Sequence, residues 1–113
     1  VGHGPSLRVE CRVPGGDVNP YLAVSGLVAA ALNGVEHALP LPPPVDGNAY
    51  ATDGPRVPAT LDEAAGLWSD STLAAGAFGQ EVMAHYANMA RVELDSYHAA
   101  VTDWELRRCF ERL

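Results

Sequence analysis

Apolar and charged residues alternate strictly over residues 7–13, close to the start of the chain. The apolar positions are Leu7, Val9, Cys11 and Val13, and the charged positions between them are Arg8, Glu10 and Arg12. Successive side chains of a β-strand point to opposite faces, so the alternation predicts a half-buried strand at about residues 6–13. One face would enter a core, and the other would present a carboxylate between two guanidinium groups.

The charged face of this segment has two interpretations. Neighbouring side chains on one face lie about 7 Å apart, which is twice the rise per residue. One anion could therefore contact both arginines, or a hard divalent cation could bind Glu10 while an arginine holds the anion. The other interpretation is a solvated surface with cross-strand ion pairs, and the spacing alone favours it.

A second motif follows at a short distance. After the turn Pro14-Gly15-Gly16-Asp17, the chain reads Asn19-Pro20-Tyr21-Leu22-Ala23 and opens an apolar, alanine-rich helix. Together the two motifs resemble the glutamine synthetase family, in which an Arg-x-Glu-x-Arg strand near the C-terminal end of the catalytic domain precedes Asn-Pro-Tyr-Leu-Ala. The similarity continues to Gly34-Val35-Glu36 and, more loosely, to the C-terminus. It implies that residues 1–113 are the C-terminal portion of such a catalytic domain, and an incomplete domain.

The resemblance also implies roles for the three charged residues. Glu10 matches a glutamate that binds a divalent metal, Mg²⁺ or Mn²⁺, and Arg12 matches an arginine that contacts the glutamate substrate and the transferred γ-phosphoryl group. Arg8 matches an arginine on the side of the ATP phosphates. The implied enzyme phosphorylates the side chain of glutamate with ATP, and an amine then displaces phosphate to give a γ-glutamyl amide.

The family's catalytic chains are several times longer than 113 residues. Most of their metal ligands would lie upstream of this segment, so we expect no turnover by the chain alone. Active sites of the family form between neighbouring subunits, which implies a homo-oligomer of the parent protein. The short length and an apolar first helix leave an alternative open, a non-catalytic helical interaction module.

The C-terminal segment bears on the amine. Val101-Thr102-Asp103-Trp104-Glu105 and the ending Phe110-Glu111-Arg112-Leu113 depart from the ending of the ammonia-using bacterial enzymes. They look more like relatives that join glutamate to polyamines or other amines, and ammonia remains an alternative.

Composition excludes several kinds of partner and chemistry. The net charge is −7 and the seven basic residues are all arginine, which argues against nucleic acid and anionic membrane surfaces. The absence of lysine excludes a P-loop lysine or a Schiff-base lysine within these residues. The longest apolar run, Leu22–Leu32, is too short to span a bilayer. Cys11 and Cys109 show no disulfide spacing, so we expect buried thiols and a cytoplasmic protein.

The remaining sequence predicts four or five helices, which makes the fold α+β and mainly α. The first helix should run from Pro20 to residue 37 or 38, before an irregular proline-rich connection over residues 39–58. Capping signals at Thr60, at Ser69-Asp70 and at Thr102 should begin further helices, and a long helix should follow Gly79. The apolar stripe of that helix should be core or subunit interface; it comprises Met83, Tyr86, Met89 and Tyr97. The pairs Glu81/His85 and Asp95/His98 favour surface contacts over metal ligation.

Overall fold

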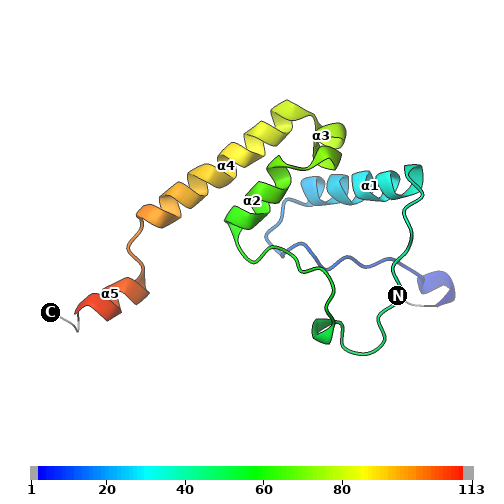
Figure 1. The fold of residues 1–113 in the computed structure, drawn as a ribbon, viewed down its shortest axis with the longest axis horizontal. Coiled ribbons are helices and arrows are strands. Elements are labelled where there is room, and N and C mark those ends of the chain that lie inside the picture. Colours follow the sequence, from blue (N-terminus) through cyan, green and yellow to red (C-terminus); the bar gives the residue numbers. More distant parts are fainter. Residues whose placement is uncertain (1–2, 111–113) are drawn as a thin grey trace. The chain divides into compact units, whose positions relative to one another are not determined.

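The computed structural model describes residues 3–110, and this part of the chain contains α-helices, two 3-10 turns and no β-strand (Figure 1). The elements are η1 (Gly4–Ser6), α1 (Pro20–Glu36), η2 (Ala49–Ala51), α2 (Leu61–Ser69), α3 (Thr72–Phe78), α4 (Gln80–Ala99) and α5 (Asp103–Phe110). The chain divides into two units, unit 1 (Val1–Val57) and unit 2 (Pro58–Leu113). Across the described residues, no helix combines the length and apolar character needed to cross a membrane.

The predicted strand at residues 6–13 is wrong, although the mainly helical class is confirmed. Ser6 ends the turn η1, and residues 7–13 are irregular. The apolar side chains of the segment are exposed, and that of Val9 is 98% exposed. A strand forms only when its backbone N–H and C=O groups bond to a neighbouring strand, and no other segment of residues 3–110 provides one. Cys11 is accordingly exposed, and so is Cys109 on α5, so the prediction of buried thiols is also wrong.

Helix α1 begins as predicted and ends at Glu36. The Asn19 side chain accepts hydrogen bonds from the backbone N–H groups of Tyr21 (3.0 Å) and Leu22 (3.3 Å), and Pro20 takes the first helical position. Most large apolar side chains of α1 are exposed in this structure: Tyr21, Val24, Leu27, Val28, Leu32 and Val35. Apolar residues therefore lie around most of the helix, which has no pronounced polar face, as its sequence indicates.

The proline-rich connection is irregular apart from η2. The Asn48 side chain accepts a hydrogen bond of 3.0 Å from the Tyr50 N–H and thereby caps this turn. Arg56 Nη2 donates to the carbonyls of Tyr50 (3.1 Å) and Thr52 (3.4 Å). These local bonds satisfy backbone groups that the prolines leave without a helix or sheet.

Unit 2 has a small core in which α2 and α3 pack on α4. Trp68 of α2 lies against the rings of Phe78 and Tyr86, with centroid distances of 5.6 and 6.2 Å. Its indole Nε1 donates a hydrogen bond of 3.0 Å to the Met83 carbonyl. Met83 and Ala74 are the buried residues of this core, with 5% and 4% of their surface exposed. Met83 therefore confirms part of the predicted apolar stripe.

Two of the three caps predicted after α1 lie where the sequence placed them, at the starts of α2 and α5. The Thr60 side chain accepts from the Glu63 N–H (3.2 Å), and Glu63 reaches back to the Ala59 N–H (2.9 Å). Helix α3, in contrast, is capped by Ser71, whose hydroxyl accepts from the Ala74 N–H at 3.1 Å. The prediction of a cap at Ser69-Asp70 is wrong because α2 continues through Ser69 and Asp70 follows its last turn.

The predicted cap at the start of α5 is reciprocal. The Glu105 carboxylate accepts from the Thr102 N–H (2.8 Å) and the Thr102 hydroxyl (3.0 Å), while the Glu105 N–H donates to Thr102 Oγ1 (3.3 Å). The backbone N–H of Thr102, and next its hydroxyl, lower the pKa of Glu105 below its ordinary value of 4.5.

This cap predicts a pH dependence for α5. A carboxylate whose pKa is lowered in the folded state stabilises the helix fully above pH 4.5. This contribution is lost as the pH falls through the lowered pKa of the folded state. We expect the ¹³C carboxyl resonance of Glu105 to titrate with a midpoint below 4.5. In Thr102→Val, which removes the hydroxyl donor, the midpoint should move upward. A wild-type midpoint at or above 4.5 would contradict the cap.

Candidate functional site

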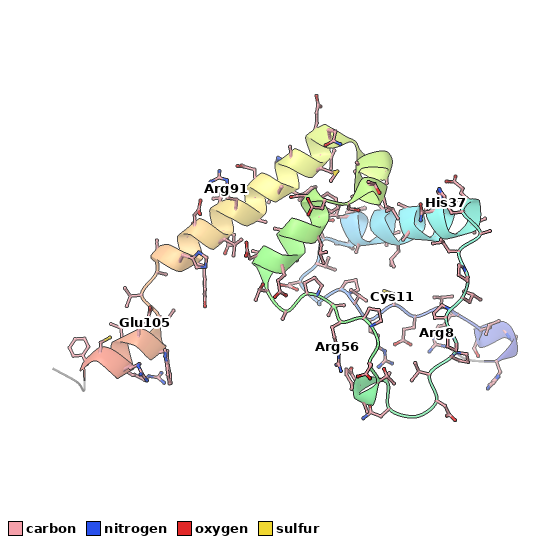
Figure 2. All side chains as sticks on the ribbon, in the orientation of Figure 1. Arg8, Cys11, His37, Arg56, Arg91 and Glu105 are labelled. Carbon is pink, nitrogen blue, oxygen red and sulfur yellow. The ribbon has the colours of Figure 1, made fainter. Side chains whose placement is uncertain are left out.

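The three predicted site residues lie in unit 1, on the irregular segment between η1 and α1. Figure 2 shows Arg8 and Cys11 along this part of the chain. Arg12 Nε donates to Glu10 Oε1, so these two residues form an ion pair. The Arg12 side chain is 84% exposed and that of Glu10 is 33% exposed. The structure therefore brings together two of the three residues.

Arg8 makes a different contact from Arg12. Its Nη1 donates a hydrogen bond of 3.3 Å to the carbonyl of Ser6. The Arg8 guanidinium thus contacts a backbone carbonyl, whereas the Arg12 guanidinium contacts the Glu10 carboxylate.

The turn before Arg8 contributes Ser6, which the sequence analysis did not single out. The Ser6 hydroxyl donates to the His3 carbonyl (2.8 Å), and the His3 N–H donates to Ser6 Oγ (3.3 Å). Because His3-Gly4-Pro5-Ser6 departs from the Ser/Thr-x-x-Glu/Gln pattern of a capping box, the sequence carried little signal for this contact. This turn fixes the backbone whose carbonyl binds Arg8.

The donor chemistry of Glu10 fits one ligand of a divalent metal. An accessible carboxylate is a suitable ligand for a hard cation such as Mg²⁺ or Mn²⁺. Within residues 3–110, however, no group of three or more His, Cys, Asp or Glu residues could hold a metal ion. The described residues therefore do not form a metal site of three or more such ligands around Glu10, and a complete site would require ligands from elsewhere.

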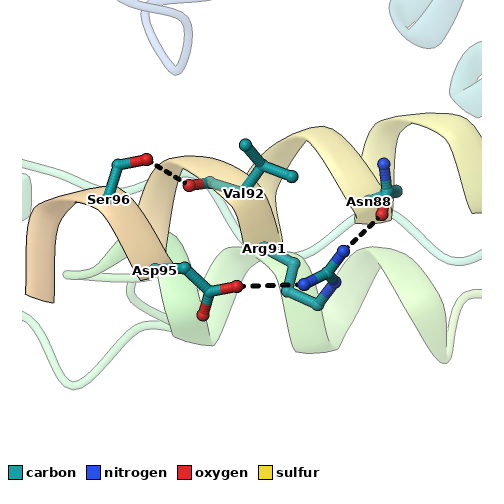
Figure 3. Close-up of polar contacts among 5 residues, drawn as sticks. All are labelled: Asn88, Arg91, Val92, Asp95 and Ser96. Carbon is teal, nitrogen blue, oxygen red and sulfur yellow. Dashed lines mark hydrogen bonds and ion pairs between the residues drawn. The ribbon is translucent and has the colours of Figure 1, made fainter. Parts of the chain in front are cut away.

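Asp95 and His85 on α4 contact residues other than the pair partners that the sequence suggested for them. Arg91 donates to Asp95 (2.9 Å) and to the side chain of Asn88 (2.8 Å), as Figure 3 shows. The ring of His85 lies against Tyr86, with a centroid distance of 5.3 Å.

Unit 2 contains an open groove of about 500 Å³, and none of the motif residues line it. It lies between the start of α2 and the later turns of α4, and its lining comprises Thr60, Leu61, Asp62, Glu93, Leu94, Tyr97 and His98. Residues 8–12 carry the two arginines and the carboxylate that the sequence singled out, so they remain the candidate site.

Comparison with known proteins places these observations in a family. The family described as glutamine synthetase, catalytic domain, matches residues 1–109. The chain is 70% identical to a gamma-glutamylethanolamide synthetase of Streptomyces coelicolor, over 100% of this chain and 24% of that protein. It is 38% identical to a glutamate–isopropylamine ligase of a Pseudomonas species, over 93% of this chain and 24% of the relative. A glutamine synthetase of Thermus thermophilus is 34% identical, over 93% of this chain and 25% of the relative. The chain thus spans about a quarter of the length of these relatives, and it belongs to the glutamine synthetase family.

Proposed function

We propose that, in a protein of the family's full length, residues 1–113 form the C-terminal portion of the catalytic domain of an ATP-dependent ligase. The enzyme would join the side-chain carboxylate of glutamate to an amine. The observation that carries this proposal is the Arg8-x-Glu10-x-Arg12 motif, followed by Asn19-Pro20-Tyr21, in a chain that is 70% identical over its whole length to a gamma-glutamyl amide synthetase.

The proposed reaction has two steps. A γ-carboxylate oxygen of glutamate attacks the γ-phosphorus of ATP, and ADP leaves. The amine nitrogen then attacks the carbonyl carbon of γ-glutamyl phosphate, inorganic phosphate leaves and the nitrogen loses a proton. Both steps develop charge on phosphoryl oxygens, which fixed positive groups stabilise.

The three residues of the candidate site would have different roles in this reaction. The Arg12 guanidinium would bind the carboxylate of glutamate and the transferred phosphoryl group, for which its planar fork is suited. Arg8 would bind ATP phosphate oxygens. Glu10 would hold a divalent metal together with ligands from other parts of the protein. When bound, the metal would neutralise charge on the phosphoryl oxygens.

The amine is proposed from two relatives. The 70% identical protein is named for ethanolamide formation, and the 38% identical one for isopropylamine. Both names denote small primary amines, so we propose ethanolamine as the first acceptor to test, with polyamines and ammonia as alternatives. We also propose that the full-length protein is a homo-oligomer in the cytoplasm.

An amine panel tests this function directly. A protein of the family's full length that contains residues 1–113, called the longer protein below, would be incubated with ATP, Mg²⁺, glutamate and one amine at a time. The amines are ethanolamine, isopropylamine, a diamine and ammonium. Phosphate release and product mass would be measured together. We expect the γ-glutamyl amide of ethanolamine to form fastest, and no product from residues 1–113 alone. The absence of any amide from a folded oligomer would contradict the proposal.

A further inference from the structure

Helix α1 carries a row of large apolar side chains along one side. Steps of three and four residues separate them, and such steps place side chains on one face of a helix. The row, called the α1 stripe below, comprises Tyr21, Val24, Val28, Leu32 and Val35. Each of these residues is exposed, from 53% for Val28 to 85% for Tyr21. No charged residue occurs between Pro20 and Val35, so the stripe is an uncharged apolar surface.

A different side of α1 is partly covered. Leu22, Gly26, Ala29 and Asn33 follow one another at the same steps of three and four residues, and each is half-buried. The helix therefore has one side that is already partly withdrawn from solvent and another, the α1 stripe, that is exposed. Contiguous exposed apolar surfaces mark places where a protein packs against something else.

We propose that the α1 stripe packs against the part of the same polypeptide that lies outside residues 1–113, as an internal interface of the longer protein. The chain spans about a quarter of the length of its relatives, so most of such a protein lies outside these residues. Permanent interfaces are more apolar than transient ones, which carry a polar rim. An uncharged stripe fits a permanent contact within one fold.

This interface has a consequence for the candidate site. Helix α1 begins shortly after Arg12, and the Asn19 cap fixes its first turn. Packing of α1 on the rest of the polypeptide holds the end of segment 8–12 close to the only source of further metal ligands. The consequence rests on the proposed function, whereas the interface itself does not.

Thiol labelling of the longer protein tests whether the α1 stripe is covered. Val28 and Val45 belong to the same unit and are almost equally exposed in this structure, at 53% and 54%. We expect a maleimide to modify the thiol introduced by Val28→Cys at least about 10-fold more slowly than the one introduced by Val45→Cys, because only opening of a packed helix exposes it. Peptide mass spectrometry distinguishes these thiols from Cys11 and Cys109. Equal rates would overturn the inference.

Photo-crosslinking identifies what covers the stripe. Tyr21 would be replaced by p-benzoylphenylalanine in longer protein assembled from ¹⁵N-labelled and unlabelled chains. We expect crosslinks to peptides outside residues 1–113 that carry the same label as Tyr21, because the contact lies within one polypeptide. The control is the same replacement at Tyr50, which is also 85% exposed and should not crosslink to those peptides.

The other crosslinking results would overturn the inference. A crosslink confined to residues 1–113 would mean that these residues cover the stripe themselves, and a crosslink between differently labelled chains would mean that a second copy covers it. The same crosslinked peptides from Tyr21 and Tyr50 would show no specific contact. Amide formation is measured separately, so this inference and the proposed function can fail independently.

Discussion

Glu10→Gln in the longer protein is expected to lower the rate of γ-glutamyl amide formation by about 100-fold or more. Glutamine keeps the size and polarity of the side chain but removes the charge that a hard cation requires. Changes in groups that only support metal ligands already cost about 10- to 100-fold, so the loss of a ligand should reach at least the upper end. The measurement is kcat from phosphate release at saturating ATP and glutamate, over a series of Mg²⁺ concentrations.

Glu36→Gln provides the matched control for this substitution. Glu36 is an exposed glutamate of the same unit, at the last position of α1. We expect its replacement to change kcat by less than about twofold, because a surface change away from any special contact has little effect. If Glu10→Gln were as neutral as Glu36→Gln, the metal role would be untenable. The alternative of a non-catalytic helical module would then gain support.

The helix starts were predictable because a cap is a local event. Asn19, Thr60 and Thr102 each bond to backbone groups within three residues, so all the partners can be read from consecutive positions. The family could be predicted for a similar reason, since its two motifs are short and lie at a fixed spacing. The error at α3 arose where two hydroxyl residues, Ser69 and Ser71, compete over a short distance.

The strand was not predictable from the same information. Alternation shows which face a side chain would take, but a strand depends on a partner that can lie anywhere in a longer protein. The proposed site shows the same limit. Spacing placed Glu10 and Arg12 on one face, yet whether they pair or bind separate ligands depends on side-chain geometry. Sequence therefore identified the candidate residues and left their mutual contact undetermined.

The core of unit 2 supports a second prediction with a large effect, the substitution Trp68→Ala. Trp68 contacts the rings of Phe78 and Tyr86 and donates to the Met83 carbonyl, so it links α2, α3 and α4. Replacing a large aromatic side chain in a core by alanine costs about 3–5 kcal/mol. Because Trp68 is only half-buried, we expect about 3 kcal/mol, measured as the loss of protection in hydrogen exchange of α2 and α4 in the longer protein.

Two further variants separate the contributions of Trp68. Trp68→Phe keeps an aromatic ring but removes the indole N–H, so it should cost about 1 kcal/mol, the net value of one hydrogen bond. Trp104→Ala is the control, because the side chain of Trp104 on α5 is 68% exposed, and it should change protection of α2 and α4 by less than about 0.5 kcal/mol. Equal losses for the Trp68→Ala and Trp104→Ala variants would mean that unit 2 is not stabilised through Trp68. A graded series, with alanine worse than phenylalanine at position 68, would show that ring packing contributes more than the hydrogen bond to Met83.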